Sequence, residues 1–251
     1  MLEGTYSSYL EKNIYKITNV LTYIIKESDN VSYNDKDYSI PFNLSLNIVG
    51  NSNLPFSKQM DLWKKGKWNN QVNLVVLKET PQLYLDLGLK DNPITVTSNK
   101  MDRIVNESGK QKDTYHNLGI KTVKQLPNAI SNPLNIIEST TSKDSIVVVT
   151  ELADKNNNLV VVSMLIDGKG HIEIFDVNNK IKNKSVLANV MTSAYGRNNY
   201  DNWIENNKNN IIYDKDDGII KKRVNGQWVQ FPNADNSSSN NISQFDDYVK
   251  L

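Results

Sequence analysis

Side chains able to do chemistry gather in one short stretch of the sequence, VMTSAYGRNN at residues 190–199. Around a glycine it carries hydroxyl groups, a phenol and a guanidinium, at Thr192, Ser193, Tyr195 and Arg197. Ser193 and Tyr195 occupy alternate positions, so in a strand both would point to one face. Arg197 could clamp a phosphate through paired N–H donors. The alternative interpretation is the polar face of an ordinary edge strand with its turn.

The two histidines, His116 and His171, are the side chains whose ordinary pKa lies near neutral pH. His171 directly follows a glycine turn, which predicts a solvent-facing strand residue. His116 lies in TYHNLG, just before or within a short helix, where it is either a buried structural histidine or an acid–base group. RNA can be cut without metal when acid–base groups act on the 2′-hydroxyl and the leaving oxygen, and when cationic or hydroxyl donors hold the phosphorane. His116 and the residues at 192–197 could supply these groups.

The composition describes a globular chain of 251 residues, 38% apolar and 23% charged, with room for one large domain or two small ones. A formal net charge of +1 argues against a broad nucleic-acid-binding surface, so any contact with nucleic acid must be local. The one dense basic cluster is Lys221, Lys222 and Arg223. We take this cluster, together with Thr192, as a candidate substrate-binding group.

Several classes of site have no signature in the sequence. Without cysteine the chain can form neither a disulfide nor a thiolate nucleophile. The acidic run DKDDG at 214–218 lacks the downstream ligands of a calcium loop and is interpreted as a turn. No metal and no cofactor are therefore expected. No apolar run approaches the ~20 residues of a membrane span, so no membrane partner is expected either.

Two tryptophans flank a basic turn in DLWKKGKW, which leaves two interpretations of this segment. Trp63 and Trp68 could anchor the core, with the lysines forming a solvated rim. Alternatively, the rings could stack on bases and the lysines could contact phosphates, as in proteins that bind single-stranded nucleic acid.

Hydrophobic periodicity and turn signals predict the secondary structure. The first part of the chain is expected to hold a helix at 5–28, a strand at 40–50, a strand at 94–97, a helix capped by Ser98, and a helix at 120–126 ended by Pro127. Strands are then expected at 134–139, 144–152, 156–166, 171–177 and 189–197, with a hairpin turn at Asp167–Gly170 and helical or irregular structure at 180–189. A helix at 199–210 and a final hairpin at 211–231 complete the pattern.

This order predicts an α+β fold, in which helices precede a curved, mainly antiparallel sheet of four to five strands and cover one face of it. Three segments are expected: an α/β extension of unknown role at 1–73, a principal domain at 74–232, and a polar tail at 233–251.

The segment from about Leu74 to Pro232 resembles the C-terminal toxin-like domain of phage MuF (head-morphogenesis) proteins and related polymorphic toxins. The matching runs are ETPQLYLDLGL, DNPITVTSNKMDRI, HNLGIKTVKQLPNAISNPLNIIEST, SIVVVTEL, VVVSMLI, NVMTSAYGRNNYDNWI, IIYDKDDG and WVQFP. The resemblance implies the barnase–EndoU–colicin–RelE group of folds, many of whose members are metal-independent ribonucleases. It also places the family's helix histidine on His116 and its S-x-Y-x-K/R strand on Ser193, Tyr195 and Arg197.

The expected function is a toxin-like ribonuclease, encoded by a phage or bacterium, that cleaves RNA by transesterification in the cytoplasm of a host or target cell. A cognate immunity protein is an expected partner. One alternative is a non-catalytic module that binds a protein through the same cleft. Another is ADP-ribosyl transfer, although the chain has no Arg…Ser-Thr-Ser…Glu-x-Glu pattern. The sequence identifies no second acid–base residue, because Glu151 and Glu173 cannot be placed from it.

Overall fold

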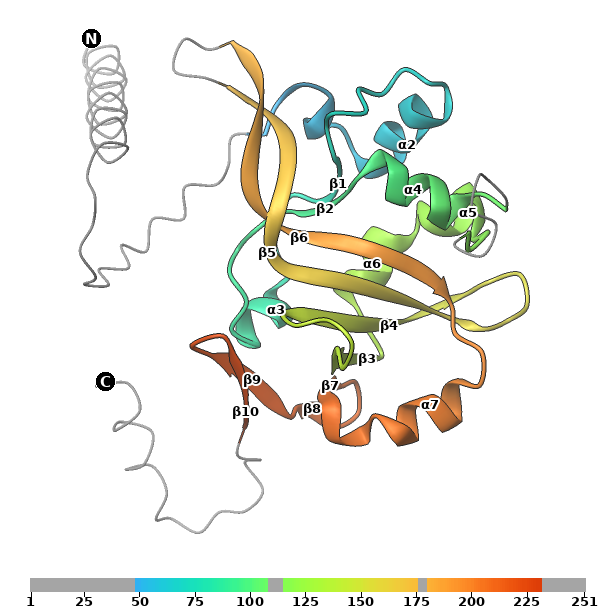
Figure 1. Cartoon of the computed structure of the whole chain (residues 1–251), viewed down its shortest axis with the longest axis vertical. Helices are drawn as coiled ribbons and strands as arrows, with labels where there is room; N and C mark the ends of the chain where they lie inside the picture. The colour runs from blue at the N-terminus through green and yellow to red at the C-terminus, as the bar shows by residue number, and fades with distance from the viewer. Residues whose placement is uncertain (1–47, 108–114, 176–179, 232–251) are drawn as a thin grey trace, which may run out of the picture. The chain divides into compact units, whose positions relative to one another are not determined.

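The computed structural model describes residues 48–107, 115–175 and 180–231 (Figure 1). All of these except Lys180 belong to one compact unit. The helices are α2 (Phe56–Lys64), α3 (Gln82–Asp86), α4 (Ser98–Val105), α5 (Gly119–Val123), α6 (Leu126–Ser131) and α7 (Tyr200–Asn206), with 3-10 helices η1 (Gly50–Asn53) and η3 (Lys208–Asn210). The strands are β1 (Leu74–Leu77), β2 (Ile94–Val96), β3 (Asn135–Glu138), β4 (Ser145–Ala153), β5 (Leu159–Phe175), β6 (Ile181–Gly196), β7 (Ile211–Asp214), β8 (Gly218–Ile219), β9 (Lys221–Val224) and β10 (Gln227–Gln230).

Among the described residues, eight strands form one sheet in the order β1-β2-β6-β5-β4-β3-β7-β8, and β9 pairs with β10 in a separate hairpin. Every neighbouring pair in the large sheet is antiparallel except β2 with β6, which is parallel. The expected α+β class and mainly antiparallel sheet are confirmed. The expected count of four to five strands is wrong, because β1 and β2 extend one side of the sheet and β7 and β8 the other.

The turn expected at Asp167–Gly170 does not exist, because β5 runs through it and pairs with β6 on both sides. The register shifts between Leu165 and Gly168, so the segment forms a β-bulge, and Figure 1 shows both strands bending sharply. A Cβ atom on Gly170 would lie 3.0 Å from the Cβ of Ala188, so the glycine permits close approach. The helical or irregular structure expected at 180–189 is likewise wrong, since β6 begins at Ile181.

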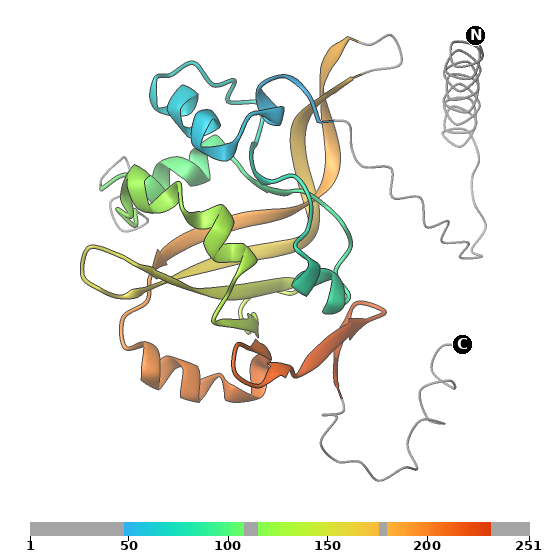
Figure 2. The same cartoon turned by 180° about the vertical axis from the view of Figure 1, so that it is seen from behind.

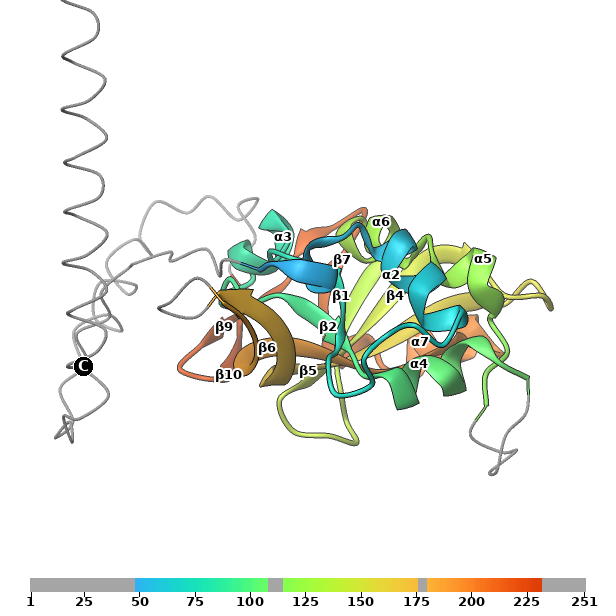
Figure 3. The same ribbon diagram turned by 90° about the horizontal axis from the view of Figure 1, so that it is seen from above.

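The two faces of the sheet bury different sets of residues. Val160 and Val162 of β5 point into the main core, which contains residues from α2 to α6. Figures 2 and 3 show α2, α3, α5 and α6 gathered on one side of the strands. Val161 points to the opposite face, where it packs with Trp203 and Ile204 of α7. The expectation of helices on one face therefore holds for α2–α6, whereas α7 covers part of the other face.

Three local features near α4–α6 differ from expectation. Thr97, not Ser98, caps α4: its hydroxyl accepts from the Lys100 N–H at 3.3 Å. The helix expected at 120–126 is two helices, α5 and α6. Pro127 lies in the first turn of α6 rather than ending a helix, because this position needs no N–H donor.

The main core begins before the expected boundary at residue 74. Phe56 and Met60 of α2, together with Trp68 and Val72, are buried in the same cluster as residues from β1 to β7. The helix expected at 5–28, most of the strand at 40–50 and the tail at 233–251 lie outside the described residues. Within the described ranges, no helix is long and apolar enough to cross a membrane.

Candidate active site

The position of His116 follows from how α4 meets the edge of β6. Strand β2 pairs with β6 only from Asn189 to Met191, and the chain then turns into α4, which packs against β6. The segment before α5 is bonded to the end of α4: the His116 N–H donates to the Arg103 carbonyl at 2.8 Å, and the Leu118 N–H to the Ile104 carbonyl at 3.0 Å. These bonds bring His116 to the part of β6 that β2 leaves uncovered.

Two of the expected site residues contact the imidazole directly. His116 Nε2 lies 3.2 Å from Ser193 Oγ, and the donor in this hydrogen bond depends on the histidine tautomer. The His116 and Tyr195 rings have centroids 5.2 Å apart and are tilted by 36°. Ser193 and Tyr195 therefore lie on one face of β6, in agreement with their alternate spacing.

The imidazole is half-buried, and this changes its protonation. Burial lowers the pKa of His116 below its ordinary value, and the nearby positive charge of Lys100 lowers it further. The neutral ring therefore dominates at neutral pH. A neutral imidazole beside hydroxyl groups can accept a proton, as a general base must.

Arg197 lies just past the end of β6 and stacks on α7. Its guanidinium carbon is 4.7 Å from the centre of the Trp203 ring, and its buried Nε has no hydrogen-bond partner among the described residues. Tyr195, Arg197 and Trp203 line a pocket of about 460 Å³, together with Gly196, Asn198, Asn199, Asn202 and Asn206. Tyr195 thus contacts His116 and also lines the pocket that holds Arg197, but the structure shows no direct contact between His116 and Arg197 among its described interactions.

Gly196 allows the end of β6 to lie close to Asp154. A Cβ atom at Gly196 would lie 2.0 Å from Asp154 Oδ2, and Asp154 is fixed because its carboxylate accepts from the backbone N–H groups of Asn156 and Asn158, both at 2.8 Å. Asp154, Lys100 and the asparagines of the pocket could not be identified as site residues from the sequence. The asparagine-rich run NYDNWIENNKNN at 199–210 was predicted only as an amphipathic helix.

The residues expected to bind substrate do not join this group. Thr192 falls in a register shift between Ser193 and Met191, and its hydroxyl donates to the Ser163 carbonyl at 3.2 Å. Lys221 donates to the Asn209 carbonyl at 2.5 Å. Lys222 lies 4.2 Å from the centre of the Phe231 ring.

Arg223, the third member of the basic cluster, is engaged in ion pairs. It pairs with Asp144 at 2.7 Å and with Asp167 at 3.8 Å, and only 10% of its side chain is exposed. None of the interactions described for the cluster reaches His116, Ser193 or Tyr195, and Figure 1 shows β9 far from α5.

The two glutamates that the sequence could not place are both engaged elsewhere. Glu151 pairs with Lys215. Glu173 accepts from the backbone N–H groups of Asn51 at 2.6 Å and Ser52 at 3.2 Å. Within the described part of the chain neither contacts His116, so neither is positioned as its acid–base partner.

Comparison with known proteins gives one family. No curated protein and no solved structure matches the chain. The family model described as the Phage MuF-C-terminal domain matches residues 107–221. This range contains His116, Ser193, Tyr195 and Arg197, and it begins immediately after α4. Residues 107–221 of this chain are therefore similar to the phage MuF C-terminal domain.

Proposed function

We propose that the chain is a toxin-like ribonuclease that cleaves RNA by transesterification without a metal ion. The observation that carries the proposal is the position of His116, half-buried with its Nε2 3.2 Å from Ser193 Oγ and its ring against Tyr195. An acid–base group beside hydroxyl donors on the face of a sheet is the arrangement that this reaction needs.

In the proposed reaction, neutral His116 accepts the proton of the ribose 2′-hydroxyl. The 2′-oxygen attacks phosphorus, the bond from phosphorus to the 5′-oxygen breaks, and the products are a 2′,3′-cyclic phosphate and a 5′-hydroxyl. The leaving oxygen must receive a proton, and Tyr195 is the candidate donor because its ring contacts His116 and lines the Arg197 pocket.

Arg197 is the proposed phosphate contact. Negative charge grows on the phosphoryl oxygens in the transition state, and a guanidinium stabilises it with two parallel N–H donors. Arg197 has an Nε without a protein partner, while Trp203 supports its planar face. A ligand with acceptor oxygens would approach the guanidinium from the pocket that Arg197 lines.

We also propose that the chain has the barnase–EndoU–colicin–RelE type of fold. Two observations favour this: helices precede the mainly antiparallel sheet, and residues 107–221 match the phage MuF C-terminal domain. A toxin of this kind would act on RNA in the cytoplasm of a host or target bacterium and would be held inactive by an immunity protein.

The decisive test is RNA cleavage by the purified chain in the presence of EDTA. We expect cleavage products ending in 2′,3′-cyclic phosphate, and His116→Ala should lower the rate by about 10²–10⁴-fold because one acid–base group is lost. His171→Ala is the matched control, since His171 is an exposed residue of β5 outside the site. Cleavage that requires added metal, or that survives His116→Ala, would contradict the proposal.

One observation favours a non-catalytic alternative. No described carboxylate hydrogen-bonds to His116, so the site lacks the paired acid and base of many nucleases. A folded chain that cuts no RNA, but binds a protein partner through Tyr195, Arg197 and the neighbouring asparagines, would support a binding module instead.

A further inference from the structure

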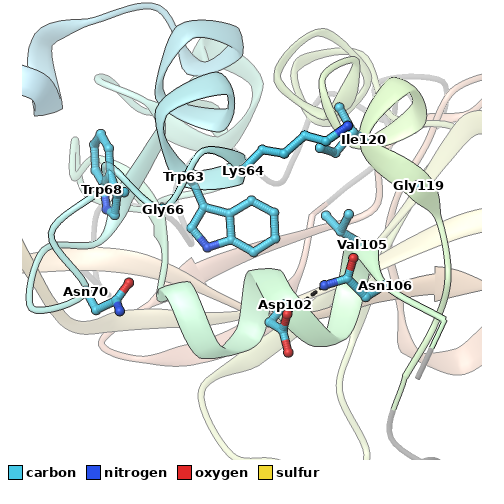
Figure 4. A pocket seen from close by; sticks show the side chains of 10 residues that line it. All are labelled: Trp63, Lys64, Gly66, Trp68, Asn70, Asp102, Val105, Asn106, Gly119 and Ile120. Carbon is cyan, nitrogen blue, oxygen red and sulfur yellow. Dashed lines mark hydrogen bonds between the residues drawn. The ribbon is translucent and has the colours of Figure 1, made fainter. Parts of the chain in front are cut away.

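The two tryptophans of DLWKKGKW have different environments. Trp68 is buried, and its indole N–H donates to the Val72 carbonyl at 2.9 Å, so it is a core anchor. Trp63, near the end of α2, is only partly buried. Figure 4 shows its indole in the middle of a pocket formed by the end of α2, by α4 and by the start of α5. The pocket has a volume of about 570 Å³.

The floor of this pocket is polar and fixed. Asp102 accepts from the Tyr115 hydroxyl at 2.8 Å and from the Asn106 amide at 2.6 Å. Outside the pocket lining, Lys124, which directly follows α5, pairs with Asp61 of α2 at 2.6 Å. These contacts hold the carboxylate in place and fasten two of the three walls to each other.

The rim of the pocket offers donors that the protein does not use. Lys64 is exposed, and the described residues provide no hydrogen bond or ion pair for Lys64, for the Trp63 indole N–H or for Asn70, all of which line the pocket. Lys65 and Lys67 add positive charge beside it. Gly119 leaves the wall open, because a Cβ atom there would meet no atom within 4 Å.

We propose that this pocket binds an unpaired nucleobase of single-stranded RNA. The base would stack on the Trp63 indole, its amino and ring N–H groups would donate to Asp102, and Lys64 would pair with the adjoining phosphate. A duplex keeps its bases stacked and their pairing edges occupied, so it would not be accepted. The proposal rests on the proposed function for the choice of RNA.

The same short segment joins the pocket to His116. Tyr115 holds Asp102 at the floor, Gly119 and Ile120 form the wall, and His116 lies between them in the chain. The Asn117 N–H donates to the Asn106 carbonyl at 3.0 Å, which fixes the segment to the end of α4. A nucleobase stacked on Trp63 would thus lie next to the backbone segment that contains His116, the proposed general base.

The test is binding of a fluorescent single-stranded 2′-O-methyl oligonucleotide, which has no free 2′-hydroxyl and cannot be cut by transesterification. Fluorescence anisotropy should show that Trp63→Ala weakens binding about 5- to 100-fold, the typical effect of losing one stacking contact. Trp63→Phe should retain much of the affinity, because a phenyl ring still stacks. The same oligonucleotide annealed to its complement should bind weakly to every variant.

A charge reversal provides a second variant that leaves the core intact. Lys64→Glu should weaken binding, whereas Lys58→Glu should have much less effect, since Lys58 is an exposed lysine of the same helix outside the pocket. The proposal is overturned if the wild-type chain binds no single strand. Equal affinity of Trp63→Ala and wild type, with both chains folded, or equal effects of the two reversals would also overturn it.

Different experimental outcomes would contradict the proposed ribonuclease activity and the proposed nucleobase pocket. Binding that depends on Trp63, in a chain that cuts no RNA, would support the pocket and contradict the ribonuclease. RNA cleavage that depends on His116, with a KM unaffected by Trp63→Ala, would support the ribonuclease and contradict the pocket.

Discussion

If the chain has the proposed ribonuclease activity, the imidazole of His116 should determine its pH dependence. Its pKa lies below the ordinary value of about 6.5 because the ring is half-buried and near Lys100. If the neutral ring is the base, kcat/KM should fall as the pH drops through the lowered pKa of His116. A rate profile measured on a dinucleotide substrate, whose phosphodiester stays ionised throughout this pH range, would check this. An activity that rises as the pH falls would contradict it.

The same pKa shift affects stability in a definite direction. Between the lowered pKa and 6.5 the unfolded chain binds the proton more readily than the folded one, so the free energy of unfolding falls as the pH falls. We expect His116→Ala to lessen this dependence relative to His171→Ala, as measured by urea unfolding at several pH values. An identical pH dependence in the two variants would show that His116 is not responsible.

A substitution of Arg197 would distinguish the proposed catalytic role of this side chain from a role in RNA binding. Arg197→Lys keeps the charge but loses the planar fork, so turnover in a single-turnover assay should fall by at least about tenfold while RNA affinity changes little. Because the guanidinium stacks on Trp203, the melting temperature should also fall slightly. A large loss of melting temperature with unchanged turnover would identify Arg197 as a structural residue.

At the scale of elements, α2 protects the edge of the sheet. Gln59 is fully buried, and its amide accepts from the Val75 N–H at 2.7 Å and donates to the Val75 carbonyl at 3.1 Å. The Gln59 side chain therefore hydrogen-bonds the backbone groups of Val75 on the edge of β1 that has no partner strand among the described residues. Sequence periodicity gave no sign of this role, because glutamine in an amphipathic helix is ordinarily assigned to its exposed face.

Replacing Gln59 should therefore destabilise the fold. Gln59→Leu leaves a buried N–H and a buried carbonyl unpaired, which should lower the free energy of unfolding by about 2 kcal/mol or more. Gln82→Leu is the control, since Gln82 is exposed and bonds only to Asp86 of its own helix at 2.8 Å. Chemical denaturation of both variants would measure the difference, and equal stabilities would contradict the role of Gln59.

At the scale of the whole molecule, residues 56–72, which precede β1, contribute to the main core. Phe56, Met60, Trp68 and Val72 are all buried against the helices and the sheet, and burying a large apolar side chain contributes about 1.5–3 kcal/mol. Their sum is comparable to the ~5–15 kcal/mol net stability of a domain.

A chain that starts at residue 74 should consequently fail to fold cooperatively. A chain that starts at residue 48 keeps α2 and should melt in a single transition, as followed by circular dichroism. If both chains melt alike, the packing of α2 contributes little, and the boundary expected at residue 74 is adequate.

The sequence by itself determined those features that depend on neighbouring residues. Runs of β-branched residues predicted β3, β4 and the first half of β5, and period-two spacing placed Ser193 and Tyr195 on one face.

Tertiary structure decided the features that depend on distant partners. The glycines after Asp167 favour a local turn, but continued pairing of β5 with β6 satisfies more backbone groups. Likewise, the tertiary packing of α2, α4 and α5 leaves Trp63 partly exposed and buries Trp68. The two side chains are identical and close in sequence, so the sequence alone could not distinguish their environments.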